Sequence, residues 1–159
     1  MDHINNEKLT PALEADLTRY IDRFRMAGHD LEFDDPVFVS LELGLHVCVA
    51  DDYFRADVKR ALLEVFSNRL LADGRRGLFH PDNFSFGQTV WLSPLYAAAH
   101  AVPGVASAEV TVFRRQGDLD DAALLAGKLV LGRLEIARLD NDRNFPEHGV
   151  LAIELHGGK

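Results

Sequence analysis

His46 and Cys48 are two potential metal ligands that stand two positions apart in an apolar run of the sequence. Positions two apart share one face of a β-strand, so both side chains could approach a single metal ion. Further ligands would have to come from His80, Asp82 or His100, and nothing in the spacing demands this. Half-buried strand residues explain His46 and Cys48 better, and we expect neither a metal site nor a cofactor.

Acidic and amide side chains also alternate in the run DNDRN at residues 140–144, as they do at the start of a calcium-binding loop. Such a loop needs glycine at its sharp turn and a glutamate at its end, where this chain has Phe145 and Leu151. Asp and Asn side chains frequently cap backbone groups in turns. Turn chemistry therefore explains the run better than calcium binding.

The sequence contains no recognisable arrangement for covalent or acid–base catalysis. Its serines lack the Gly-x-Ser-x-Gly turn that exposes a nucleophile. The adjacent carboxylates at residues 34–35, 51–52 and 120–121 usually face apart and stand where loops or helix caps need them. The run GRRG at residues 74–77 lacks the Lys-Ser/Thr of a phosphate-binding loop. We expect a protein that is not an enzyme.

Aromatic and arginine side chains gather in GRRGLFHPDNFSFGQTVW, residues 74–91. Glycine and proline make this run a poor helix, and its aromatic content predicts a connection ordered by packing, with at least two of its three phenylalanines as anchors. Any part that stays exposed suits a protein partner, because aromatic residues and arginine dominate interfaces. The candidate interaction residues are Phe38, Arg75, Arg76, Phe79, Phe84 and Phe86.

Composition limits the classes of protein that this chain can represent. With 159 residues, it is long enough for one domain with a real core. Its 17 basic and 25 acidic residues give a net charge of −8, which argues against nucleic acid as a partner. Cys48 is the single cysteine, no apolar run is long enough to cross a membrane, and no secretory signal is visible. We expect synthesis in the cytoplasm and no membrane partner.

The first half of the chain has two strong element patterns. Thr10 and Pro11 are typical of a helix start, and an apolar stripe at helical spacing follows until Gly28. From residue 37 to residue 49, every odd position is apolar, which predicts a strand with one buried face. Gly44 at its centre indicates a bend or bulge.

The remaining elements are read from caps, stripes and turns. We expect a helix after Asp51 and Asp52 that ends at Gly74, and a short helix over residues 93–102. A turn at residues 103–104 leads into a strand that points Ala108, Val110 and Val112 one way. Residues 116–128 are expected to be a loop with one helical turn. Residues 134–139 and 150–155 predict two strands that pair as a hairpin.

These elements predict an α+β fold. Joining the first two strands through helices would give a split βαβ, ferredoxin-like sheet with helices on one face, an N-terminal helix and a C-terminal β-hairpin. Residues 1–9 are expected to be a flexible arm, and residues 10–159 a single α+β domain. A half-apolar second face that carries Phe38 and Gly44 would suit a homodimer or a higher oligomer.

Several stretches together resemble the C-terminal region of baseplate J-like proteins, the putative baseplate assembly proteins of contractile phage tails and related injection systems. The run at residues 74–91, followed by LSP and VPGV, carries most of the resemblance. It extends to YIDRFRMAGHDL at residues 20–31, DYFRADVK at 52–59, LEIARLDND at 134–142 and ELHGGK at 154–159.

The resemblance implies a structural role, in which the domain helps to build the baseplate wedge through contacts with other baseplate subunits. Members of this family are usually much longer, so the chain is expected to be the C-terminal region of a longer baseplate protein, located in a virion or a phage-tail-like particle. The family has no catalytic residues to transfer to this sequence. The alternative is a ferredoxin-like module that binds a small ligand or has a regulatory role, and a metal-dependent hydrolase is a third hypothesis.

Overall fold

The computed structural model describes residues 9–26 and 28–159 and confirms an α+β fold. The flexible arm predicted for residues 1–9 lies outside the described residues, apart from Leu9. In chain order, the helices and strands are α1 (Pro11–Ile21), β1 (Val37–Val49), α2 (Arg55–Val65), η1 (Pro81–Asn83), β2 (Val90–Trp91), α3 (Leu92–His100), β3 (Val105–Arg115), α4 (Ala122–Ala126), β4 (Lys128–Leu129), β5 (Glu135–Arg138), η2 (Pro146–His148) and β6 (Val150–Gly157).

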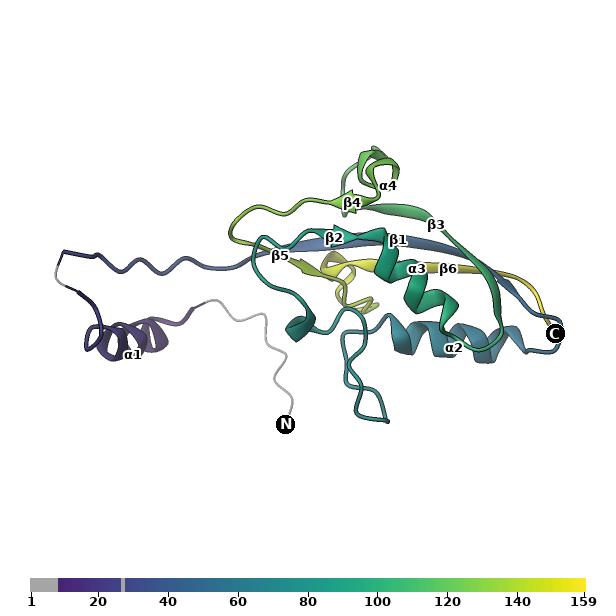
Figure 1. Cartoon of the computed structure of the whole chain (residues 1–159), viewed down its shortest axis with the longest axis horizontal. Coiled ribbons are helices and arrows are strands. Elements are labelled where there is room, and N and C mark those ends of the chain that lie inside the picture. The colour runs from purple at the N-terminus through teal and green to yellow at the C-terminus, as the bar shows by residue number, and fades with distance from the viewer. Residues whose placement is uncertain (1–8, 27) are drawn as a thin grey trace.

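Strand β1 has the predicted bounds and is the centre of the main sheet (Figure 1). Its odd positions from Val39 onward are buried, whereas most of its even positions are half-buried. On one side it pairs with β3 in antiparallel fashion, and on the other with β5 and then β6, both parallel. The alternation therefore predicted the buried face correctly, because only one face of this sheet is covered by helices.

The strand order corrects the ferredoxin-like prediction. A split βαβ unit would place its two strands parallel with another strand between them, whereas β1 and β3 are antiparallel neighbours. Two helices, α2 and α3, connect β1 to β3. A single helix would bring the chain back to the start of β1. The second helix instead returns the chain to the end of β1, where the N–H of Ala50 donates to the carbonyl of Gly104. Strand β3 must then run antiparallel to β1.

The predicted C-terminal hairpin is also wrong, although both of its strands exist. β5 pairs with residues 37–40 of β1, and β6 pairs with residues 42–49. The two strands thus follow one another along the same edge of β1 and run in the same direction. The turn-rich residues 139–149 bulge out between them, because parallel neighbours of β1 cannot also reverse into a hairpin with each other.

Gly44 lies at the predicted irregularity, where the pairing of β1 with β3 shifts register between Gly44 and Leu45. A side chain there would collide with Thr111 and Val112, since an added Cβ would lie 2.8 Å from the Thr111 hydroxyl. The shift turns Val110 and Phe113 into the core and leaves Val112 on the opposite face, opposite Gly44. The prediction that Val110 and Val112 point the same way is therefore wrong, because a bulge inserts one residue into the alternation.

Helices α2 and α3 lie together on one face of the sheet (Figure 1) and supply its cover. Neither begins with the predicted side-chain cap: Phe54 precedes α2 and Trp91 precedes α3. α2 also ends at Val65 rather than at Gly74, because the chain turns at Ser67, whose hydroxyl accepts from the backbone N–H of Arg69. The helix residues buried against the sheet are Val58, Leu62, Leu92, Leu95 and Ala99.

Helix α1 stands away from this body at the end of an extended segment, residues 28–36, which continues the line of β1 and is the arm that joins the helix to the body (Figure 1). Thr10 caps it as predicted, with its hydroxyl accepting from the N–H of Leu13. It ends at Ile21, so Phe24 lies in the turn that follows. No residue of α1 is buried. In its apolar stripe, Leu13 and Tyr20 are exposed, and Leu17 and Ile21 are half-buried.

Candidate interaction site

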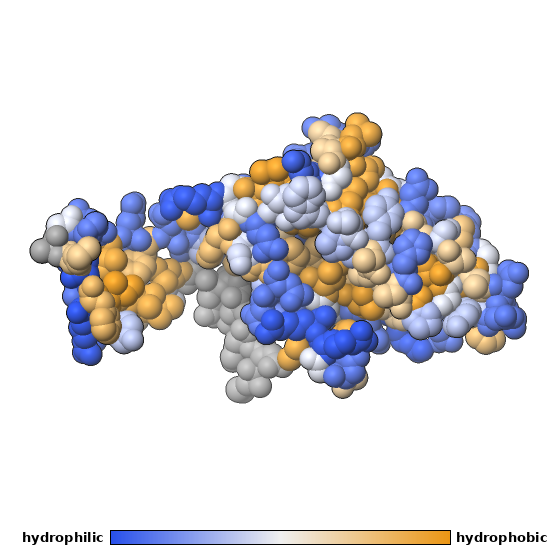
Figure 2. All heavy atoms as spheres, viewed as in Figure 1, coloured by the Kyte–Doolittle hydropathy of each residue, from blue (hydrophilic) through white to orange (hydrophobic). Residues whose placement is uncertain are grey.

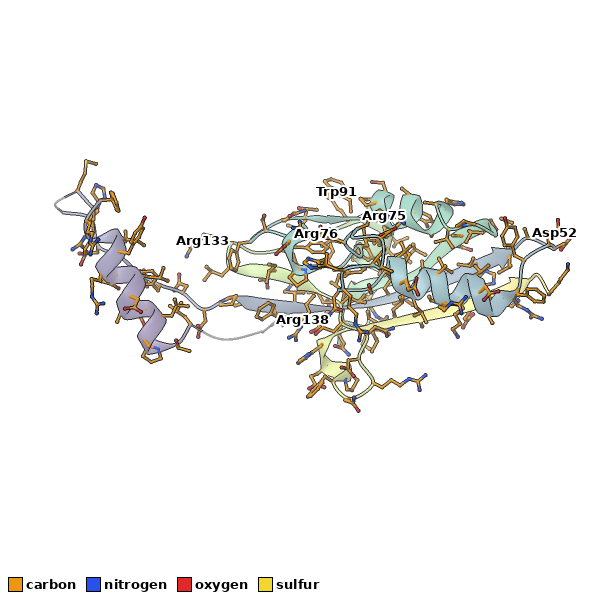
Figure 3. The ribbon with its side chains drawn as sticks, turned by 90° about the horizontal axis from the view of Figure 1, so that it is seen from below. Asp52, Arg75, Arg76, Trp91, Arg133 and Arg138 are labelled. Atoms are coloured by element: carbon orange, nitrogen blue, oxygen red, sulfur yellow. The ribbon has the colours of Figure 1, made fainter. Side chains whose placement is uncertain are left out.

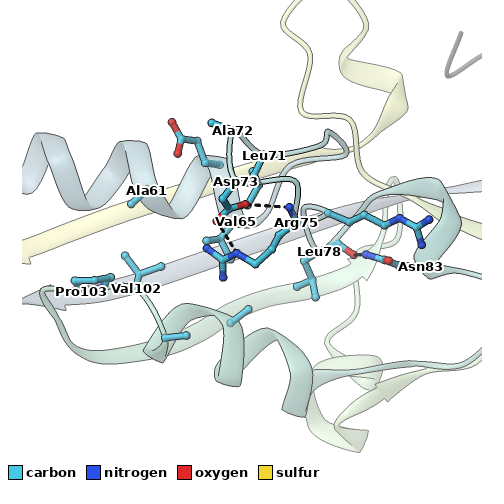
Figure 4. Close-up of a pocket in the computed structure, with 14 residues that line it drawn as sticks. Ala61, Val65, Leu71, Ala72, Asp73, Arg75, Leu78, Asn83, Val102 and Pro103 are labelled. Atoms are coloured by element: carbon cyan, nitrogen blue, oxygen red, sulfur yellow. Dashed lines mark hydrogen bonds and ion pairs between the residues drawn. The ribbon is translucent and has the colours of Figure 1, made fainter. Parts of the chain in front are cut away.

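An open groove of about 510 Å³ lies between α2, α3 and the loop at residues 66–78 (Figure 4). Because α2 turns Leu62 toward the sheet, Ala61 and Val65 on its next face line the groove. Val102 and Pro103, after the end of α3, form the opposite wall. The walls are thus mainly apolar and include small side chains, which allow another chain to approach the backbone closely.

The third wall is a short reversal of the chain at residues 66–78. Leu71 donates its N–H to the carbonyl of Arg75 at 2.7 Å, and Gly77 donates to the carbonyl of Arg69 at 2.8 Å. Gly77 packs so tightly against Ser67 that a Cβ there would lie 2.8 Å from the Ser67 carbonyl carbon. These contacts fix the loop beside the groove.

The rest of residues 74–91 follows a fixed path, as predicted. Phe79 is buried next to Phe66, with ring centroids 6.5 Å apart, and Phe84 stacks on Phe79 at 5.8 Å. The side-chain amide of Asn83 donates to the carbonyls of Gly77 and Leu78. Phe79 and Phe84 are therefore anchors, which confirms the prediction for two of the three phenylalanines.

Phe86 is the phenylalanine of this segment that remains at the surface, with 57% of its area exposed. Phe79 has only 3% exposed, so it has no surface to offer a partner, and its place among the candidate interaction residues is corrected. Phe38 is half-buried because the guanidinium of Arg138 lies 5.2 Å from its ring centroid. The six candidates are thus not brought together in one site.

Arg75 and Arg76 lie at the lip of the groove, where both belong to its lining. Hydrogen bonds from the backbone N–H and the guanidinium of Arg75 lower the pKa of Asp73. Arg76 pairs with Asp82 at 2.9 Å, and the side chains of Arg75 and Arg76 are 76% and 49% exposed. Exposed pairs of this kind add little stability, so either arginine can exchange its carboxylate for one on a partner.

The uncovered face of the sheet carries polar contacts rather than an apolar patch. Arg138 donates to the hydroxyl of Ser40 at 3.0 Å, and that hydroxyl donates to the carbonyl of Glu147. Burial lowers the pKa of Arg138. Arg114 pairs with Glu42 at 2.8 Å on the same face. These contacts link neighbouring strands. This face is therefore more polar than the half-apolar surface that the sequence predicts for contact with a partner.

His46 lies on this face beside His156, with ring centroids 4.5 Å apart. Within residues 9–26 and 28–159, no three His, Cys, Asp or Glu side chains are placed to hold one metal ion. His80 instead accepts from the N–H of Asp82 and so caps η1. In residues 140–144, Asp142 accepts from the backbone N–H of Asn144 at 2.8 Å and Asn141 from that of Leu151 at 3.0 Å, as turn chemistry predicts.

Sequence reasoning missed the groove because three separate segments form it. Alanines such as Ala98 and Ala101 carry no sequence signal of exposure, and a helix stripe does not reveal which neighbour will cover it. The exposed stripe of α1 was missed for the same reason. Within the described chain, no helix is both long enough and apolar enough to span a membrane.

The sequence matches no known protein-family model. It also has no significant match among curated proteins.

Proposed function

We propose that this chain is a structural component of a contractile-tail baseplate, which joins a wedge through contacts with other baseplate subunits and performs no catalysis. The observation that carries the proposal is α1, an eleven-residue helix without a buried residue. Leu13, Tyr20 and Phe24 on this helix and its following turn are exposed by 50%, 62% and 73%. A helix this short is only marginally stable alone in water. Its exposed apolar side chains therefore indicate contact with a partner protein.

The segments on which the baseplate resemblance rests support the same role. Residues 74–91 border the open groove and end in the exposed ring of Trp91, and residues 20–31 include the end of α1 and the arm that carries it. Two of the five stretches that carry the resemblance thus include surfaces that can meet other subunits, while the other three lie around α2, β5 and β6. A net charge of −8 favours protein partners over nucleic acid in this role.

The alternative, a ferredoxin-like module for a small ligand, is less well supported. It requires a split βαβ sheet, whereas β1 and β3 are antiparallel neighbours. An enclosed polar pocket beside the sheet would favour it, but the groove is open and its walls are mainly apolar. No specific observation favours this alternative.

Deletion of the gene in the producing organism tests the proposal. We expect the loss of complete contractile tails in electron micrographs and their recovery when the wild-type gene is returned. Antibody labelling of the complemented particles should mark the baseplate end of the tail. Normal, fully assembled particles in the deletion strain would overturn the proposed function.

A further inference from the structure

Helix α1 and the groove are two apolar surfaces of one chain, and neither is covered by the described residues. The helix presents a stripe of Leu13, Leu17, Tyr20 and Ile21 along one side, which Figure 2 shows as an apolar surface away from the body. The groove has the form that such a helix needs, a trough between two helices with small side chains on its walls. Helix-in-groove contacts use this combination of an amphipathic helix and an apolar trough.

We propose that α1 of one copy lies in the groove of a second copy of this chain. The inference rests on the proposed function in treating the chain as an assembly domain, and it deepens that function by naming a partner. Each copy has one helix and one groove, so a reciprocal exchange closes a symmetric dimer and covers all four surfaces.

The place where the arm joins the body favours docking of α1 in a second copy over docking in the groove of the same chain. The N–H of Val37 donates to the carbonyl of Leu134 at 2.9 Å, and Asp34 pairs with Arg133 at 3.4 Å. The arm therefore leaves the body beside Arg133, at one end of the sheet, whereas Asp52 marks the other end (Figure 3). The wall of the groove that Pro103 forms lies toward this far end, because the next residue, Gly104, accepts from the N–H of Ala50 just after β1. α1 turns back along the arm, since the N–H of Leu9 donates to Asp35 at 3.0 Å, but it remains at the Arg133 end of the sheet (Figure 3).

One acidic residue of α1 and the two arginines of the groove offer opposite charges, although Glu64 and Asp73 also line the groove. Glu14 and Asp16 flank the apolar stripe of α1 on opposite sides at 100° per residue. Glu14 makes no ion pair with any described residue. At the groove, Arg75 and Arg76 lie on the lip and pair only with exposed carboxylates. Asp16 pairs with Arg19 within the helix, so a docked α1 would place its other acidic flank, at Glu14, beside these arginines.

Light scattering over a wide concentration range, applied to the purified full chain and its variants, tests the exchange. We expect the wild type to have twice the mass of one chain at high concentration. Leu13→Asp, on the stripe, and Ala101→Arg, on an exposed wall of the groove, should each raise the dimer dissociation constant by about tenfold or more, as substitutions at the centre of an interface do.

Two matched controls carry the same kinds of change outside the proposed contact. Ala15→Asp places a charge on the far side of α1, and Leu125→Asp alters a leucine on α4 that is 87% exposed. Both should remain dimeric. If Ala101→Arg fails to fold by circular dichroism, Ala72→Arg on the opposite wall of the groove replaces it, since Ala72 is also exposed.

Mixing the two defective variants gives the sharpest test. A Leu13→Asp copy retains its groove and an Ala101→Arg copy retains its helix, so the mixture should form heterodimers through one intact contact. A wild-type chain that is monomeric at every concentration overturns the exchange, as does a dimer that neither substitution weakens. A monomer that is still required for tail assembly would refute the exchange alone, whereas a dimer whose deletion leaves tails intact would refute the proposed function alone.

Discussion

At the scale of single residues, the most strongly perturbed carboxylate is Glu135, at the start of β5. Both of its oxygens accept from Arg115, at 2.8 and 2.7 Å, and one also accepts from the N–H of Gly132. These hydrogen bonds, with that from Arg115 the largest cause, lower the pKa of Glu135 from 4.5 to about 2. Because Arg115 lies on β3 and Glu135 on β5, the pair ties the two neighbours of β1 together.

Substitution of this carboxylate should change the dependence of stability on pH. A depressed pKa in the folded state stabilises the fold above the unfolded value of 4.5, and this stabilisation is lost as the pH falls toward 2. Glu135→Gln should therefore melt at a lower temperature than the wild type at pH 7. This difference in melting temperature should shrink as the pH falls from 4.5 toward 2. Thermal unfolding followed by circular dichroism measures this. Glu32→Gln, on the exposed arm, is the control, and a constant difference at all pH values would contradict the prediction.

At the scale of elements, the loop that walls the groove depends on a glycine. Gly77→Ala would push a methyl group into the backbone of Ser67, which cannot move without disturbing the end of α2. We expect a loss of about 1–3 kcal/mol in the free energy of unfolding, as for other overpacked positions. Chemical denaturation measures the loss. Gly132→Ala is a matched control, because the nearest atoms that its methyl group would meet belong to the Glu135 side chain, at 3.4 Å or more; equal losses would contradict this account.

Elements defined by local pattern could be predicted from the sequence, whereas their pairing could not. β1 was predicted with both ends correct because thirteen residues alternate without interruption. Both helices between β1 and β3 were predicted too, but the direction of β3 depends on how α2 and α3 pack on the sheet, which no local pattern encodes. The same limit applies to the site: two anchoring phenylalanines were predicted, but the groove and the exposed stripe of α1 depend on which surfaces meet in three dimensions.

At the scale of the whole molecule, β1 holds the described fold together. From residue 42 to residue 49 it pairs on both sides, with β3 and β6, while β6 pairs with β1 alone among the described strands. Opening β1 therefore requires breaking both ladders, which amounts to unfolding the domain. Amide hydrogen exchange should be slowest in peptides from residues 43–49 and faster in those from β6. Mass spectrometry resolves the two segments, and equal protection of both would contradict this hierarchy.

Residues 139–149, between β5 and β6, leave the edge of the sheet as a loop. The strands on either side of this loop pair with separate parts of β1. The base of the loop is closed by backbone hydrogen bonds, in which Asp140 donates to the carbonyl of His148 and Asn141 to that of Gly149. Residues 142–145 beyond this base can lengthen or shorten without moving either strand, since the strand positions are set by β1. We therefore expect this tip to tolerate insertion, so that a short epitope placed there would be displayed without altering the fold.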